Sequence, residues 1–346
     1  MSEKMKIAVA MSGGVDSSVT AALLKAEGHE VIGITMRLWD GPSTAIDDAA
    51  RVADHLGIPH HVASFESCFE EHIMRYFTEE YRSGRTPNPC ARCNQLIKFG
   101  ALMDLAGRLG AGYLATGHYA RIVRGDDGIP HLMKAANISK DQSYFLFSLK
   151  QELLEKIFFP LGEVKDKSEV RRIAADMGIA VAEKHDSQDI CFIPDGEYVA
   201  FLERRGLSPM PGDFLLADGR VVGHHQGIHC YTIGQRRGMG IAWSEPLHVI
   251  SMDAESGNVI VGPEPQLYRD SFFISDCNWI HSPEQLDEVV RCKIRYRHKP
   301  VPCHVATLPG ERAEVRFHAP EKGVTPGQVA VFYRGDEVLG GGWIDR

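Results

Sequence analysis

The chain has 346 residues, of which 44% are hydrophobic and 24% charged, and it carries a net charge of −8 at pH 7. That composition is ordinary for a globular protein of two or three domains, and it excludes collagen-like, coiled-coil and intrinsically disordered classes. No apolar run approaches the ~20 residues of a membrane-spanning helix, and no signal-peptide core follows the first methionine, so we expect a cytoplasmic protein without a membrane partner.

The amino-terminal half alternates short β-rich runs with helical patterns, which is typical of a parallel sheet covered by helices. The predicted strands cover residues 7–11, 31–36, 60–64 and 113–116, and the predicted helices cover 15–27, 44–56, 69–81, 96–109 and 167–177. Right-handed crossovers would bring the ends of the first and fourth strands to one ligand crevice. We therefore predict a Rossmann-like α/β catalytic domain over residues 1–196.

The pattern changes after about residue 196. One short helix is predicted at 197–205, and turns rich in Gly and Pro then separate short alternating segments such as 289–296 and 328–333. Short strands at close spacing predict a β-barrel or sandwich. We divide this half into a small central linker domain, 197–262, and a C-terminal β-barrel, 263–346.

The most informative motif, residues 11–18, reads Met-Ser-Gly-Gly-Val-Asp-Ser-Ser and stands between the first predicted strand and the first predicted helix. Two glycines allow positive φ angles and close approach of a ligand to the backbone. The amides that follow and the helix dipole would point at an anion. The loop lacks the Gly-Lys-Ser/Thr ending of the P-loop, and a strand-to-helix turn with serine caps is the structural alternative.

Two further positions belong to the predicted nucleotide site. Met36 ends the second strand, where a Rossmann-like sheet would hold adenine, although a core methionine fits the pattern equally well. Gly117 follows the fourth strand, at a position where a side chain would obstruct the crevice. The predicted nucleotide-binding residues are Ala10, Met11, Ser12, Gly13, Gly14, Val15, Asp16, Ser17, Met36 and Gly117.

The eight cysteines are too few for a disulfide-stapled scaffold, and three of them attract attention. Cys90 and Cys93 lie in a Pro-rich loop that leads into a helix, where amide dipoles and Arg92 would lower the pKa of Cys93. A single Cys-x-x-Cys is compatible with a redox pair, a metal site or coincidence, and no second pair completes a four-cysteine zinc site. Cys191, beside Phe192, fits a core cysteine as well as a reactive one.

Several short motifs of this sequence resemble those of a known enzyme family. The loop Ser-Gly-Gly-x-Asp-Ser-Ser is similar to the pyrophosphate (PP) loop of the ATP pyrophosphatases, HUP-type enzymes that cut ATP between the α and β phosphates to adenylate a substrate. Over nearly the whole chain, the sequence is similar to one branch, the tRNA-specific 2-thiouridylases (MnmA). The strings that carry this resemblance are residues 11–18, 84–89, 93–94, 97–99, 115–119, 140–146, 187–192, 231–238 and 295–297.

The resemblance implies a tRNA-uridine 2-sulfurtransferase that uses ATP and Mg²⁺. In this family, AMP is first placed on the C2 oxygen of the wobble uridine, because that oxygen is a poor leaving group. The position of Cys191 then carries a persulfide, and the persulfide, or hydrosulfide released from it, attacks C2 so that AMP leaves. The position of Cys93 is the nucleophile that resolves the persulfide to a disulfide. The implied partners are tRNAs of the Lys, Glu and Gln anticodon type and a sulfur donor, either a cysteine desulfurase or a sulfur-relay carrier.

The sequence departs from the family at Cys90, where many relatives carry Asp. One hypothesis is that Cys90, Cys93 and Cys191 hold three irons of a [4Fe–4S] cluster, with the fourth iron open to hydrosulfide. A harmless substitution is the alternative.

The resemblance also implies contacts with RNA. Lys140 would bind a phosphate, and Gln142 would bind base edges or ribose. Arg295 and Tyr296 combine a cation with a ring on which a base can stack. A charged strand edge has a similar sequence pattern and is the structural alternative. The predicted RNA-binding residues are His118, Lys140, Asp141, Gln142, Arg295, Tyr296 and Gln328. Residues 235–238 of the central domain would support the RNA path without an assigned role.

Three other functions are alternatives to tRNA thiolation. A PP-loop amidotransferase or ligase that adenylates a small metabolite would not depend on its cysteines. An RNA-binding module with a vestigial loop would not need Ser12, Gly13, Gly14, Asp16 and Ser17 all intact. A zinc-dependent base deaminase would need a His-x-Glu motif to accompany Pro-Cys-x-x-Cys, and that motif is missing.

Overall fold

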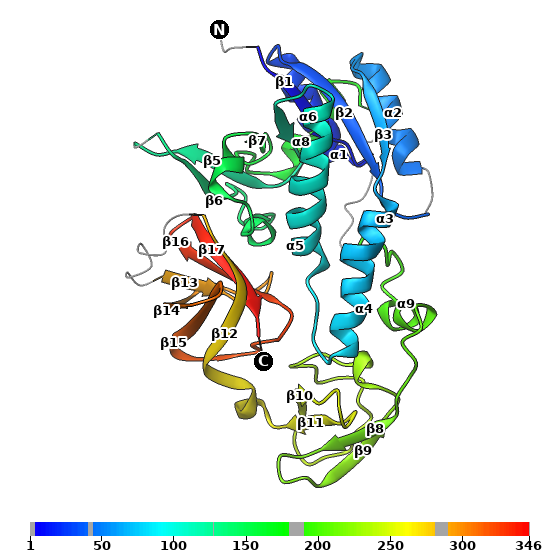
Figure 1. Cartoon of the computed structure of the whole chain (residues 1–346), viewed down its shortest axis with the longest axis vertical. Coiled ribbons are helices and arrows are strands. Elements are labelled where there is room, and N and C mark those ends of the chain that lie inside the picture. Colours follow the sequence, from blue (N-terminus) through cyan, green and yellow to red (C-terminus); the bar gives the residue numbers. More distant parts are fainter. Residues whose placement is uncertain (1–3, 41–43, 127, 180–189, 281–289, 346) are drawn as a thin grey trace.

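The computed structural model describes residues 4–40, 44–126, 128–179, 190–280 and 290–345. Figure 1 shows a sheet-and-helix domain at the top, a small β domain at the bottom and a barrel at the lower left. This architecture confirms the predicted fold class, a Rossmann-like domain followed by a small domain and a β-barrel. Within the described ranges, every helix is too short or too polar to span a bilayer.

The amino-terminal sheet has five parallel strands in the order β3-β2-β1-β4-β7. These strands are β1 (Lys6–Ala10), β2 (Glu30–Arg37), β3 (His60–Ser64), β4 (Tyr113–Ala115) and β7 (Ile157–Phe158). Because β1 lies between β2 and β4, the ends of the first and fourth strands meet as predicted.

Helices cover both faces of this sheet, so the strands are buried on both sides, as parallel strands usually are. Ile7 and Val9 point into one core, whereas Ala8, between them, points into the other. The first core lies against α1 (Val15–Ala26), α2 (Thr44–Leu56) and α8 (Lys167–Asp176), and the second lies against α6 (Leu102–Arg108).

Two long helical segments extend beyond the sheet toward the central domain (Figure 1). The first consists of α3 (Glu66–Phe69), η1 (Glu70–Met74) and α4 (Arg75–Arg82), and the second of α5 (Pro89–Cys93), η2 (Asn94–Ala101) and α6. Asn88 begins α5, since its side-chain oxygen accepts a hydrogen bond from the Ala91 amide and Pro89 occupies the first turn. Both η segments are π-helical, a feature that the sequence pattern did not predict.

A hairpin absent from the sequence prediction follows β4. It consists of β5 (Ala120–Arg124) and β6 (Pro130–Lys134), and it is followed by η3 (Ser143–Leu146) and α7 (Gln151–Leu154). Met133 in β6 pairs with Glu337 of the last barrel strand, so this hairpin joins the first domain to the barrel sheet.

The central domain is built on a four-stranded sheet in the order β10-β11-β8-β9, which encloses Phe214, Val249 and Val259. Its elements are α9 (Tyr198–Arg204), β8 (Gly212–Leu215), β9 (Val221–His225), η4 (Ile228–Cys230), β10 (His248–Met252) and β11 (Val259–Gly262), and η5 (Glu264–Leu267) leads out of it.

The C-terminal domain is a closed antiparallel barrel, because β12 pairs with β17 as well as with β15. Its strands are β12 (Tyr268–Trp279), β13 (Val290–Lys293), β14 (Val301–Leu308), β15 (Arg312–Lys322), β16 (Val329–Arg334) and β17 (Glu337–Ile344). Closure leaves few free strand edges, and the interior is filled by apolar side chains such as Ile274, Cys292 and Phe332.

Candidate functional site

The PP-loop connects the end of β1 to the start of α1. Gly13 has φ = +70°, and a Cβ there would collide with the backbone of Ala45, so glycine is required. Gly14 stands immediately before the helix, which turns the first free amides of α1 toward the loop. The loop therefore forms an anion cradle at a helix amino terminus.

Two serine hydroxyls fix the shape of this cradle. Ser17 Oγ accepts a hydrogen bond from the Ser12 amide at 3.1 Å and donates one to the Gly14 carbonyl at 3.1 Å. Ser12 Oγ lies 3.2 Å from Ser17 Oγ, and Ser12 is exposed. The Ser12 hydroxyl therefore remains accessible to a bound anion.

Asp16 in the first turn of α1 has two partners that the sequence did not reveal. Lys167 Nζ lies 2.5 and 2.6 Å from the two carboxylate oxygens, and the Tyr119 hydroxyl donates to Asp16 Oδ1 at 2.8 Å. Tyr119 belongs to one of the shared strings, but nothing in the sequence connects Lys167 to a loop about 150 residues earlier. These contacts hold a negative charge beside the cradle and neutralise it.

The other predicted nucleotide-binding residues surround the loop in different ways. A Cβ on Gly117 would lie 2.9 Å from the backbone of Asp16 and Ser17, so the missing side chain lets β4 approach α1. Met11 and Val15 are buried and Ala10 is half-buried, so we expect mainly their backbone to reach a ligand. Met36 is half-buried at the end of β2.

The two sequence regions that carry the predicted catalytic cysteines pack in one apolar cluster. Cys93 is the last residue of α5 and is buried there beside Ile97 and Phe192, with Ile190 at the edge of the cluster. In the sequence, Cys191 lies between Ile190 and Phe192, and its side chain is exposed. The preceding residues of its motif, 187–189, lie outside the described residues.

The thiols of Cys90, Cys93 and Cys191 interact electrostatically. Burial raises the pKa of Cys93 to about 11, and burial together with negative charge on Cys93 and Cys90 raises the pKa of Cys191 to about 12. Burial also raises the pKa of Cys90. Cys90 and Cys191 retain contact with solvent, but the surrounding protein removes enough water to disfavour their thiolates.

The predicted lowering of the Cys93 pKa was therefore wrong. Desolvation is the largest effect on this pKa, and Arg92 points elsewhere: its guanidinium lies 5.4 Å from the centre of the Tyr76 ring and 5.5 Å from that of Trp343. The cation that lowers the pKa of these thiols is Lys98, in η2, which acts on Cys90, Cys93 and Cys191 alike. Lys98 lies in residues 97–99, one of the strings shared with the family, and that membership is the signal by which the sequence could have marked it.

The [4Fe–4S] hypothesis is not supported. In the described part of the chain, no three His, Cys, Asp or Glu side chains are arranged to hold a metal ion. Cys93 is buried among apolar side chains, whereas Cys90 and Cys191 are exposed. All eight cysteines are free, and the disulfide that the resemblance implies for Cys93 and Cys191 is not formed here.

His118 lies between the cradle and the ring of Phe99. It follows Gly117, its Nδ1 lies 2.7 Å from Thr116 Oγ1, and its ring centre is 5.9 Å from that of Phe99. Burial, aided by the charge of Lys98, holds the pKa of His118 well below its usual range. The imidazole is therefore neutral at neutral pH.

Two side chains of the turn predicted to contact tRNA, residues 140–142, form hydrogen bonds within the protein. Asp141 is buried, and its carboxylate accepts hydrogen bonds from the Ala135 amide and from the amide and hydroxyl of Ser143. Gln142 Oε1 accepts from the Tyr119 amide at 2.9 Å. Both residues thus shape the turn that presents Lys140.

The barrel contacts the loop that precedes the cysteines. Gln328 Nε2 donates to the carbonyls of Thr86 and Pro87 at 3.0 and 2.9 Å, and the Thr86 amide donates to the Pro326 carbonyl. A predicted RNA-binding side chain therefore connects two domains.

Tyr296 and Arg295 lie farther along the barrel. The Tyr296 ring centre is 4.7 Å from that of Phe145, and Arg295 Nη1 donates to the Lys322 carbonyl at 3.2 Å.

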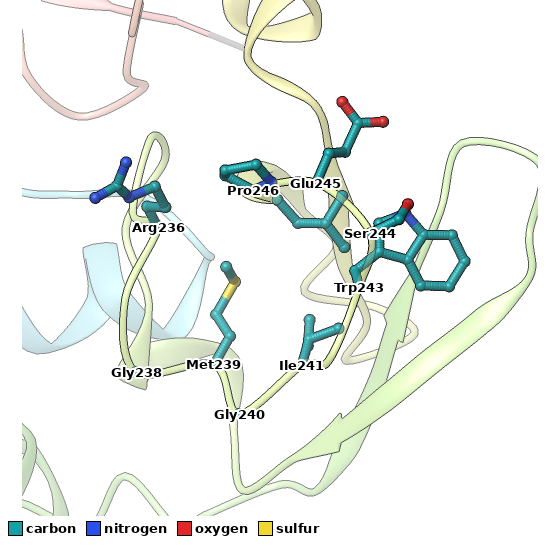
Figure 2. Close-up of a pocket in the computed structure, with 10 residues that line it drawn as sticks. Arg236, Gly238, Met239, Gly240, Ile241, Trp243, Ser244, Glu245 and Pro246 are labelled. Carbon is teal, nitrogen blue, oxygen red and sulfur yellow. The ribbon is translucent and has the colours of Figure 1, made fainter.

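Two cavities lie outside the cradle. One, of about 480 Å³, is confined to the central domain, and Figure 2 shows Arg236 on one side of it and Trp243 on the other, with Met239 between them. The neighbouring Gln235 accepts from the Thr232 amide and donates to the Arg237 carbonyl, so it shapes this loop. The second cavity, of about 450 Å³, lies where the three domains meet.

Three curated relatives, each described as tRNA-specific 2-thiouridylase MnmA, match almost the full chain. The protein of Geobacter metallireducens is 53% identical over 363 residues, covering 100% of this chain and 98% of its own. Those of Trichlorobacter lovleyi and Pelobacter propionicus are 52% and 54% identical, each covering 98% of this chain and 97% of its own. The chain belongs to the tRNA-specific 2-thiouridylase (MnmA) family.

Family models match the chain in three consecutive parts. Residues 5–195 match the tRNA methyl transferase HUP domain, 200–263 the tRNA methyl transferase PRC-barrel domain and 269–344 the aminomethyltransferase beta-barrel domain. Together with the MnmA relatives, they confirm the family that the sequence motifs indicated.

Proposed function

We propose that the protein is a tRNA-uridine 2-sulfurtransferase that adenylates the C2 oxygen of the wobble uridine and replaces it with sulfur. The observation that supports this proposal is a series of neighbouring residues that leads from the anion cradle toward the thiols. Gly117 borders the backbone of Asp16, the ring of the next residue, His118, contacts Phe99, and the neighbouring Lys98 acts on all three thiols.

The cradle suits the first stage of this reaction. The amides at the start of α1 and the hydroxyls of Ser12 and Ser17 would stabilise the phosphates of ATP while the uridine oxygen attacks the α phosphorus and pyrophosphate leaves. Asp16, in the first turn of α1, would hold Mg²⁺ beside the cradle, and the ion would supply positive charge that neutralises the phosphates. Hydrogen bonds from Lys167 and Tyr119 fix the position of the Asp16 carboxylate.

The thiols suit the second stage. The terminal sulfur of a Cys191 persulfide would attack C2, and AMP would leave with the original oxygen. The Cys93 thiolate would then attack Sγ of Cys191, so that the sulfur–sulfur bond breaks, the sulfur stays on the base and a Cys93–Cys191 disulfide forms. An external dithiol would reduce that disulfide.

The exposure of Cys191 supports loading by another protein, because a donor can reach its sulfur. We propose a cysteine desulfurase or a sulfur-relay carrier as that donor. The family resemblance supports tRNAs of the Lys, Glu and Gln type as substrates, and His118, Lys140, Arg295, Tyr296 and Gln328 as residues near the RNA.

The test is mass spectrometry of nucleosides from unmodified tRNA incubated with the protein, ATP, Mg²⁺, a sulfur donor and reductant. We expect 2-thiouridine at the wobble position, none with Cys191→Ser, and normal product with the control Cys277→Ser, whose residue lies in barrel strand β12. If Cys191→Ser still produced 2-thiouridine, the proposed sulfur route would be wrong. Pyrophosphate release with a small metabolite and no RNA would instead favour an adenylating ligase.

A further inference from the structure

Cys90 has no role in the reaction described above, although it stands three residues before the resolving thiol. Cys90 and Cys93 are the second and the last residue of α5. The sequence left a redox pair, a metal site and coincidence open for this Cys-x-x-Cys. Among the described residues, no third His, Cys, Asp or Glu side chain joins them to hold a metal ion. The geometry of the helix decides between a redox pair and coincidence.

The backbone places the two cysteines on one turn of helix. The Asn94 amide donates to the Cys90 carbonyl, and Cys93 has φ = −63° and ψ = −43°, which are helical values. Cα atoms three residues apart in such a turn are about 5 Å apart, within the range of ~4.4–6.8 Å that disulfides span. Their side chains also leave the helix on the same face. A Cys90–Cys93 bond can therefore form without unfolding of α5.

The two thiols differ in their access to solvent. Cys90 is exposed, whereas Cys93 is 8% exposed and lies in the same apolar cluster as Ile97 and Phe192. A peptide-sized disulfide therefore reaches Cys90 first, and Cys93 can react with it only through Cys90. The charge of Lys98 lowers the pKa of both thiols against the larger effect of burial, so one ammonium group favours both thiolates.

We propose that Cys90 and Cys93 form a redox dithiol that a low-molecular-weight disulfide, such as oxidised glutathione, converts to an intrahelical disulfide. The Cys90 thiolate attacks one glutathione sulfur and releases the other half as a glutathione thiolate. The Cys93 thiolate then attacks Cys90 Sγ, so that the Cys90–Cys93 bond forms and the second glutathione thiolate leaves. The two cysteine protons pass to these two thiolates, and the two electrons that the protein loses reduce the glutathione disulfide.

Oxidation of this pair withdraws Cys93 from thiolation, a consequence that rests on the proposed function. The Cys93 sulfur cannot bond to Cys90 and Cys191 at the same time, so the oxidised protein cannot resolve a Cys191 persulfide. An external dithiol that attacks the exposed Cys90 sulfur restores both thiols. Thiolation would therefore follow the ratio of thiols to disulfides around the protein.

The experiment maps disulfides in the full-length protein after incubation with oxidised glutathione, acid quenching and alkylation, without tRNA or ATP. Trypsin cuts after Arg85, Arg92 and Lys98, so a Cys90–Cys93 disulfide joins the separate peptides 86–92 and 93–98. We expect these joined peptides to be the main oxidised product of the parent. They should exceed peptides that join Cys93 to Cys191 by about tenfold, because two thiols on one helical turn have the higher effective concentration.

Three variants assign this product. Cys90→Ser should lose the joined peptides, whereas Cys191→Ser should keep them, because the pair does not need the persulfide cysteine. Cys68→Ser is the matched control: it removes another thiol whose charge reaches Cys93, and it should leave the product unchanged. Unfolding temperatures equal to that of the parent show that each variant is folded.

Two results would overturn the proposal. In the first, the parent carries glutathione on Cys90 while Cys93 remains free for alkylation, which would show that the helix does not bring the two sulfurs together. In the second, Cys93 is joined to Cys191 to the same extent in the parent and in Cys90→Ser. Neither result bears on sulfur transfer, because no tRNA or ATP is present, whereas failure of the proposed function would appear as absence of 2-thiouridine with fully reduced protein.

Discussion

Cys93 and Cys191 combine high pKa values with a location beside a single lysine. Burial disfavours both thiolates, whereas the ammonium group of Lys98 favours them. A thiol that is mostly protonated at neutral pH is protected from indiscriminate alkylation and oxidation. The reactivity of Cys93 should therefore depend strongly on pH.

The first prediction concerns that pH dependence. The Cys93 pKa is raised to about 11, so the thiolate is the minor form at every lower pH. Its fraction should rise about tenfold for each pH unit between 7 and 10. Mass spectrometry of the Cys93 peptide after brief iodoacetamide treatment should show a steadily rising alkylation rate. A rate that levels off near pH 8 would contradict the raised pKa.

The second prediction concerns Lys98. Lys98→Met removes the cation that lowers the Cys93 pKa, so that pKa should rise further and alkylation should slow. Because nucleophilicity increases with basicity, each unit of pKa increase should cost about threefold in rate below the pKa. Lys98→Arg should retain most of the rate, and Lys25→Met, at the far end of α1, should leave it unchanged. Equal alkylation rates in Lys98→Met and the parent would show that Lys98 does not act on this thiol.

The third prediction concerns Lys167. Lys167→Met leaves the Asp16 carboxylate beside the cradle without its cation, and the uncompensated charge should repel ATP phosphates. We expect the Kd for ATP, measured by calorimetry, to rise about tenfold, which corresponds to ~1.4 kcal/mol. The exposed Lys165→Met is the control. Unaltered ATP affinity in Lys167→Met would mean that the ion pair has no part in nucleotide binding.

At the scale of elements, the contact between β4 and α1 determines whether the cradle keeps its shape. Gly117→Ala would place a Cβ 2.9 Å from the backbone of Asp16 and Ser17, and backbone atoms there cannot move without displacing the helix. Overpacking of this kind costs about 1–3 kcal/mol, so the unfolding temperature and ATP affinity should both fall.

Gly107 provides the matched control for this variant. It lies inside α6, and a Cβ there meets no atom within 4 Å. Gly107→Ala should therefore stabilise the protein by about 0.5–1 kcal/mol. A Gly117→Ala protein as stable as the parent, with normal ATP affinity, would disprove the packing argument.

Local patterns were sufficient to predict four strands of the parallel sheet and the helices around them, because strand and helix periodicities are properties of neighbouring residues. The sequence pattern did not predict the π-helical segments or the hairpin β5–β6, because neither has a strong hydrophobic periodicity. The lowered pKa of Cys93 was wrong for a related reason: a helix-dipole argument is local, while burial depends on distant residues such as Phe192. The Asp16–Lys167 pair is likewise a consequence of the tertiary fold.

At the scale of the whole molecule, the barrel is coupled to the catalytic loop. Hairpin β5–β6 continues the barrel sheet through Met133 and Glu337, and Gln328 contacts the carbonyls of Thr86 and Pro87. We propose that RNA bound by the barrel would influence the position of the cysteine helix. The family motifs predicted RNA-binding residues in the barrel, whereas these interdomain contacts required the structure.

The central claim is that the cradle and the two thiols act on the same uridine, and a single-turnover experiment tests it most directly. Protein persulfidated at Cys191 is mixed with unmodified tRNA, ATP and Mg²⁺ without reductant, and nucleosides and cysteine peptides are analysed together by mass spectrometry. The account predicts that 2-thiouridine and a Cys93–Cys191 disulfide appear in equal amounts and only when ATP is present. Formation of 2-thiouridine while both cysteines remain reduced, or in the absence of ATP, would contradict it.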